Sequence, residues 1–209
     1  MADTQTYNWD DVNVNESITA EEQKASENIS NSTPVGTFLC TIAESVAKEN
    51  AMSAYTCIAA GWKMRIDSVI EIEQPVFDDK GQAVKRDGQQ LMKVLPVKDA
   101  AKKNADALNV GRFIFDDINL FHVKEKEAMK KRRIFIAKKA GLITSESAQM
   151  TGKMWGPGAV GRQVVVKTEW NSWKDKTTGE LKKNVKVAWD GYDYAEVAGA
   201  PADDDFSGI

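Results

Sequence analysis

Two tryptophans and four lysines lie close together between positions 170 and 183. Trp170 and Trp173 lie just before the polar segment KDKTTGELKK. The cations of this segment are Lys174, Lys176, Lys182 and Lys183. Indole rings offer flat surfaces on which nucleobases stack, and flexible ammonium groups meet phosphates. This is the chemistry that a single strand of nucleic acid requires of a protein. An ordinary hairpin with core tryptophans and solvated lysines is the alternative, and the segment alone does not decide between the two.

Period-two alternation positions this segment at the tip of a β-hairpin over residues 162–194. Apolar residues recur at every second position in both flanks, which indicates two half-buried strands. Gly179 supplies the positive φ that a tight reversal needs. Trp170 continues the face of Val164 and Val166, so we predict that it points inward, whereas Trp173 has the opposite parity and is predicted to be exposed. Trp62 and Trp189 share faces with aliphatic residues and are predicted to lie in the core.

The elements before this hairpin complete a recognisable order. Alternation predicts a first strand at 37–44 and a polar connection at 45–52. Residues 54–72 are predicted to form one long second strand or two broken ones, with a bulge or corner at Gly61. Turn signals make 75–110 an insertion with a short helix near 97–108. A third strand is predicted at 112–121 and a helix at 124–140, whose run of cations is read as a solvated face.

Five strands with a helix between the third and fourth are the order of an OB-fold barrel. We therefore predict a mainly β protein: a five-stranded OB-fold domain at 34–197, a flexible acidic arm at 1–33 and a disordered acidic tail at 198–209. That fold binds oligonucleotides on its second and third strands, flanked by the fourth-to-fifth loop, which is the hairpin tip here. The predicted DNA-binding residues are Tyr55, Lys63, Arg65, Arg112, Phe115, Lys167, Trp170, Trp173, Lys174, Lys182 and Lys183.

The charge distribution agrees with a polyanionic partner although the formal net charge is −3. Residues 1–33 contain seven acids and one lysine, and the last twelve residues contain three aspartates and no cation. The middle of the chain is therefore basic, and acidic ends of this kind can compete with a polyanion for one surface.

Catalytic and membrane functions find little support in the sequence. His122 is the only histidine, no phosphate-binding glycine loop occurs, and Cys40 and Cys57 lie in apolar runs that predict buried thiols in a reducing compartment. We therefore expect no enzyme, cofactor or metal, and the absence of a long apolar run predicts no membrane span. The best catalytic alternative is a metal-dependent nuclease that uses carboxylates of Asp116, Asp117, Asp190 and Asp193.

Several segments resemble phage-encoded single-stranded-DNA-binding proteins with an OB-fold. The resemblance covers most of residues 34–197 and rests on PVGTFLCTI, GRFIFDDINL, AKKAGL, MTGKMWGPGAVGRQVVVKTEW and KKNVKVAWDGYDY. It implies a protein that coats single-stranded DNA during replication or recombination in the cytoplasm of an infected bacterial host. The end ADDDFSGI is similar to acidic tips that recruit partner proteins, which implicates Asp203, Asp204, Asp205 and Phe206. A protein-binding or phage structural module without a nucleic-acid role is the second alternative.

Overall fold

The computed structural model describes residues 33–51, 56–121, 127–143 and 150–199. Contacts divide the chain into the units Met1–Ser32 and Thr33–Ile209, and all described residues belong to the second unit. Tyr55 and the four tail residues Asp203, Asp204, Asp205 and Phe206 lie outside the described residues. Within the described residues, no helix is both long enough and apolar enough to cross a membrane.

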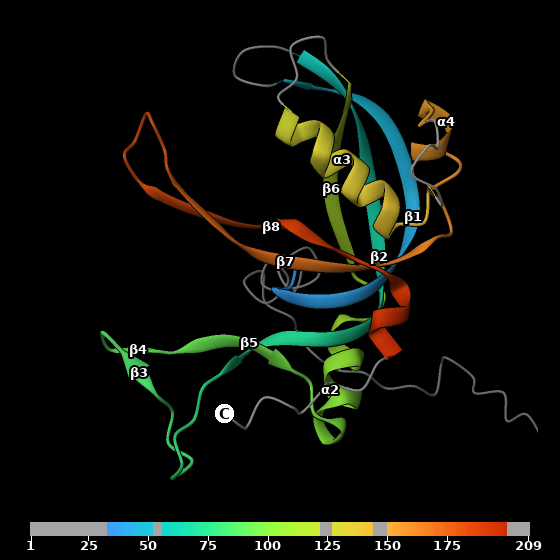
Figure 1. Ribbon diagram of the computed structural model, residues 1–209. Helices are drawn as coiled ribbons and strands as arrows, with labels where there is room; N and C mark the ends of the chain where they lie inside the picture. Colours follow the sequence, from blue (N-terminus) through green and yellow to red (C-terminus); the bar gives the residue numbers. More distant parts are fainter. Residues whose placement is uncertain (1–32, 52–55, 122–126, 144–149, 200–209) are drawn as a thin grey trace, which may run out of the picture. The chain divides into compact units, whose positions relative to one another are not determined.

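One curled antiparallel sheet dominates this unit and forms a half-barrel (Figure 1). Its strands follow the order β5-β2-β1-β7-β8, and β6 also pairs with β2. The prediction of a mainly β protein is confirmed. The long strands are β1 (Gly36–Ala51), β2 (Thr56–Pro75), β6 (Phe113–Phe121), β7 (Gln163–Lys174) and β8 (Leu181–Asp193), and β5 (Met92–Pro96) is short.

Strands β1 and β2 depart from the sequence prediction in two details. β1 continues through the stretch expected to be a polar connection, because Lys48 still pairs with Ala59 and Ala51 with Thr56. The antiparallel ladder overrides the weak strand propensity of polar residues there. β2 is one long strand, the first of the two predicted alternatives. Gly61 forms no bulge: it pairs regularly with Val46 and Asp117, and the register shifts lie elsewhere.

Apolar residues on the concave side of the sheet form the core, together with two helices. Phe38, Trp62 and Met64 are almost fully buried on the sheet, and α3 (Glu127–Lys139) adds Ile136 and Ala137. α3 follows β6 and precedes β7 in the chain, where a helix was predicted. Trp155 of the short α4 (Gly152–Trp155) also enters the core, with its ring 5.6 Å from the Trp62 ring. Burial on this scale holds the curved sheet in shape.

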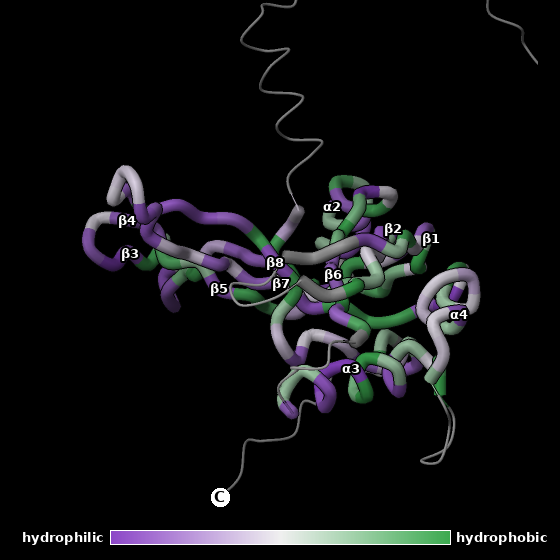
Figure 2. Tube along the Cα trace, turned by 90° about the horizontal axis from the view of Figure 1, so that it is seen from above, coloured by the Kyte–Doolittle hydropathy of each residue, from purple (hydrophilic) through white to green (hydrophobic). Residues whose placement is uncertain are grey.

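The predicted insertion contains a hairpin, an additional sheet strand and a helix. The hairpin consists of β3 (Lys85–Arg86) and β4 (Gln89–Gln90), and β5 then pairs with the end of β2. The predicted short helix is α2 (Asp99–Asn109). Figures 1 and 2 show the β3–β4 and β7–β8 hairpins extending to the same side of the sheet, with mostly hydrophilic residues in their distal parts.

Gly36 of β1 lies directly against the backbone of β2, and we expect its replacement by alanine to destabilise the fold. A Cβ atom there would lie 2.2 Å from the backbone oxygen of Glu71 and 2.9 Å from the Phe38 ring. Because a backbone group cannot rotate away, Gly36→Ala should lower the free energy of unfolding by about 1–3 kcal/mol. Denaturant unfolding measures this, and Gly152→Ala is the control, since a Cβ at Gly152 meets nothing within 4 Å. Equal stability of the two variants would contradict the close approach.

Candidate nucleic-acid interface

The distal half of the β7–β8 hairpin, residues 169–186, extends beyond the core and is called the arm here (Figure 1). Burial on β7 ends at Thr168, which is 1% exposed and accepts a hydrogen bond from the backbone N–H of Gly36. Trp170 is 53% exposed and Trp173 is 41% exposed. The prediction that Trp170 points into the core is therefore wrong. Trp170 lies on the same face of β7 as the buried Thr168, but the core ends at Thr168 and does not reach the next residue on that face. The predicted exposure of Trp173 is confirmed.

The two tryptophans of the arm lie on opposite faces of the ribbon. Trp170 pairs with Val185 and Trp173 pairs with Lys182, an odd number of residues apart on β7, so alternation separates their side chains. The Trp170 indole N–H donates to the Glu73 carboxylate over 3.0 Å, at the end of β2. The arm therefore offers one stacking surface on each side rather than two on one track.

The lysines of the arm differ in how far carboxylates neutralise them. Lys182 forms an ion pair with Asp175. The hydrogen bond from Lys182, together with the backbone N–H groups of Thr177 and Thr178, lowers the pKa of Asp175 below its ordinary value. Lys174 and Lys183 are exposed and form no ion pair with any residue that the structure describes. The same holds for Lys176, and these three ammonium groups are the ones best placed to meet phosphates.

A second group of predicted residues comes together on the convex face of β2 and β6. Lys63 pairs with Phe115 and Arg65 pairs with Phe113, whereas Ile114 faces the core. Phe115 is 61% exposed, and the Lys63 ammonium lies 4.5 Å from the centre of the Phe113 ring. This face therefore combines exposed rings with cations, as the arm does, and Phe113 is a member that sequence reasoning missed.

Carboxylates moderate the positive charge of this convex face. Arg65 contacts Asp67 at 3.0 Å, and Lys63 lies 3.8 Å from Glu44. Both cations keep exposed side chains, so these pairs are weak and exchange readily with other anions. The face supplies ring surface more than net charge.

Two other predicted residues are placed differently. Arg112 holds the end of α2: its Nη1 donates to the Asn109 side chain over 3.1 Å, and burial lowers the pKa of its guanidinium. It is therefore less available to a ligand than predicted. Lys167 is exposed on β7, two residues before the arm begins.

Trp189 is not a core residue, contrary to prediction. Its side chain is 53% exposed, and its ring centre lies 5.2 Å from the Arg132 guanidinium of α3. The pairing of β8 explains the error: Val187 opposes Thr168 but Tyr192 opposes Val166, so extra residues form a bulge that shifts the alternation. Tyr192 takes the core position instead, 3% exposed.

A buried polar network joins the free edges of β6 and β8. Asp116 accepts hydrogen bonds from the Tyr192 hydroxyl at 2.8 Å and from Arg132 at 3.0 Å. Arg132 also donates to the backbone oxygen of Trp189 over 3.0 Å. Burial, reinforced by the Asp116 charge, raises the pKa of Tyr192 well above its ordinary value, so the hydroxyl remains a donor. Arg132 thereby fixes the position of the bulge that presents Trp189.

Three of the four carboxylates considered for a nuclease, those of Asp116, Asp117 and Asp193, are engaged in separate contacts. Asp117 pairs with Lys48 at 2.8 Å and Asp193 with Lys139 at 2.6 Å. Burial raises the pKa of Asp193, but the bonds from Lys139 and the Tyr194 backbone outweigh it, so the net pKa is lowered. In the part of the chain that the structure describes, no group of three or more metal-ligating side chains occurs.

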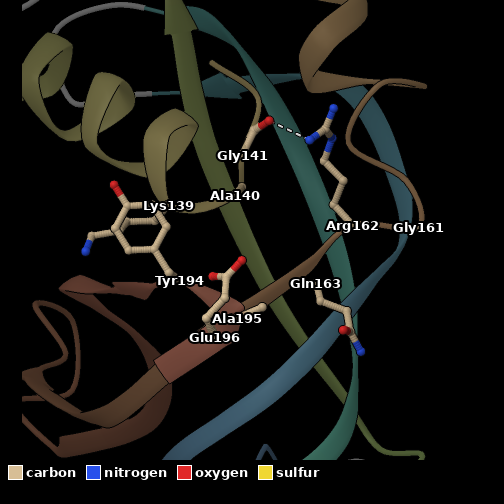
Figure 3. A pocket seen from close by; sticks show the side chains of 9 residues that line it. All are labelled: Lys139, Ala140, Gly141, Gly161, Arg162, Gln163, Tyr194, Ala195 and Glu196. Atoms are coloured by element: carbon tan, nitrogen blue, oxygen red, sulfur yellow. Dashed lines mark hydrogen bonds between the residues drawn. The ribbon is translucent and has the colours of Figure 1, made fainter. Parts of the chain in front are cut away.

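Figure 3 shows a cavity of about 390 Å³ between the end of α3, the start of β7 and η2 (Ala195–Gly199). Its cations already serve the fold. Arg162 donates to the backbone oxygen of Gly141, and the Lys139 ammonium lies 4.0 Å from the centre of the Tyr194 ring. None of the predicted DNA-binding residues lines it.

A scan of protein-family models and a search of curated proteins found no match to this chain.

Proposed function

We propose that this protein binds single-stranded DNA without sequence preference, through the arm and the convex face of β2 and β6. The observation that carries the proposal is the arm itself. The arm is an extended ribbon that has an exposed tryptophan on each face and three lysines without an ion pair among the described residues. It buries little for the fold, and it provides stacking surface and positive charge together. Large exposed aromatic residues on a monomer are typical of a binding surface.

The proposal includes an OB-type barrel as the scaffold. The long strands and α3 follow in the order β1, β2, β6, α3, β7, β8, which is the order of that fold. The exposed rings of Phe113 and Phe115 lie on the third of these strands, opposite Lys63 and Arg65 of the second. The second and third strands are where OB-folds bind oligonucleotides. The resemblance to phage single-stranded-DNA-binding proteins adds the expected role: to coat DNA during replication or recombination in a bacterial host, with the acidic tail recruiting partners.

Tryptophan fluorescence during titration with poly-dT tests this function. The chain has six tryptophans, of which Trp170, Trp173 and Trp189 are exposed and Trp62 and Trp155 are buried. We expect strong quenching by the single strand, weaker binding at high salt, and little change with the matching duplex. For Z neutralised phosphates, the log–log salt slope on a single strand is about −0.7Z, so a slope near zero would contradict phosphate contacts. No quenching with either nucleic acid would favour a protein-binding role instead.

A further inference from the structure

We propose that Trp189 and the basic face of α3 form a second stacking site, on which a single strand leaving the arm places another base. This inference rests on the proposed function and extends the DNA path beyond the arm. The strand would pass along β8 from the Trp173 side of the arm to a groove between β8 and α3.

Trp189 presents an exposed ring whose surroundings suit the stacking of a base. The Trp189 ring is 53% exposed, although large aromatic side chains are usually mostly buried. The Arg132 guanidinium lies 5.2 Å from the centre of this ring. Arg132 is itself fixed by Asp116 and by the backbone oxygen of Trp189, and its side chain is only 10% exposed. An indole beside a fixed cation is preorganised to receive a base, because neither group must be ordered on binding.

A groove of suitable size and charge lies beside this ring. A cavity of about 280 Å³ is lined by Ala128, Lys131, Arg132, Phe135, Trp189 and Asp190. Two rings and an alanine make it mainly apolar, two cations attract phosphates, and one carboxylate opposes them. The exposed cations of α3 continue the positive charge, and they are Lys130, Lys131 and Lys138. Rings beside cations favour a nucleic-acid strand, which has both bases to stack and phosphates to pair, over a partner that is purely apolar.

The groove and the arm share strand β8. Lys182, the partner of Trp173, precedes Trp189 by seven residues on β8, which is roughly 23 Å along an extended strand. Lys186 lies between them on the same face of the ribbon as Lys182. It is exposed, and its ammonium group lies 3.4 Å from the Glu169 carboxylate in a pair exposed enough to exchange with a phosphate. A strand of a few nucleotides can therefore contact the arm alone, whereas a longer strand reaches Trp189.

The test compares Trp189→Ala with the wild-type chain on oligothymidylates of about 4 and about 16 nucleotides, the range of single OB-fold sites. Loss of one stacked base should weaken binding of the longer strand about 5- to 150-fold and change the shorter one little. Trp189→Phe should restore much of the affinity, because it keeps a ring. Phe77→Ala is the matched control, since Phe77 is 58% exposed and lies outside both surfaces.

The outcomes separate this inference from the proposed function. If the wild-type chain binds the longer strand and Trp189→Ala binds it equally well, the second site is wrong and the arm site stands. If the wild-type chain binds no single strand, the proposed function itself fails. Thermal unfolding of Trp189→Ala should change only slightly, because Arg132 keeps its hydrogen bond to the backbone of residue 189 and loses only its contact with the ring.

Discussion

Replacing Trp170 and Trp173 together with alanine is expected to weaken binding of single-stranded DNA by about 5- to 150-fold if the strand follows one face of the arm, and by about 30-fold or more if it contacts both faces. Each stacked base contributes roughly 1–3 kcal/mol, and every 1.4 kcal/mol is a factor of ten in affinity. Fluorescence anisotropy with a labelled oligothymidylate measures the change independently of the tryptophans removed. Because both rings are exposed beyond the core, thermal unfolding should change little.

The single variants show which face of the arm the strand uses. Trp170 and Trp173 lie on opposite faces, so a strand that follows one face loses affinity with one variant only. Trp170→Ala also removes the hydrogen bond to Glu73. Glu73→Ala separates these effects, since it breaks the same bond, keeps the indole and removes a negative charge; its affinity should not fall. Wild-type affinity in the double variant would contradict the role of the arm.

Trp62→Ala is expected to lower the free energy of unfolding by about 3–5 kcal/mol, the range for truncating a buried large aromatic residue. Trp62 is 1% exposed and packs between the rings of Trp155 and Tyr192, with centres 5.6 and 6.2 Å away. Its indole N–H donates to the backbone oxygen of Trp155 over 3.0 Å. Since most domains are stable by only about 5–15 kcal/mol, this one change removes a large share. Denaturant unfolding followed by circular dichroism measures it.

Trp62→Phe distinguishes packing from hydrogen bonding at this position. Phenylalanine keeps most of the ring contacts and loses only the donor to Trp155. The Trp155 oxygen still accepts a bond from the Ser45 hydroxyl over 2.7 Å, so it is not left unsatisfied. The phenylalanine variant should therefore be clearly more stable than the alanine variant. Equal losses in both would show that the hydrogen bond, and not the packing, dominates.

Local patterns in the sequence were sufficient to predict the strands, the hairpin and the exposed Trp173. Alternation of apolar and polar residues is a property of the chain itself, because side chains of a strand point to opposite faces wherever the strand lies. Lys63 and Arg65 were identified in the same way, whereas the sequence left open which face of the third strand is buried. The structure buries Ile114, and the pairing of β2 with β6 places Phe115 beside Lys63. The mainly β class therefore needed no tertiary information.

Only the tertiary structure decided where alternation stops predicting burial. The parity of Trp170 is inward, but burial requires a partner, and the core ends at Thr168. The bulge in β8 depends on how that strand pairs with β7, so the exposure of Trp189 is set by residues distant in the sequence. Arg132 lies in a run of cations that looks merely solvated, yet it joins β6 to β8 through Asp116 and the Trp189 backbone. Strand pattern is local, whereas burial and charge pairing depend on neighbours that only folding brings together.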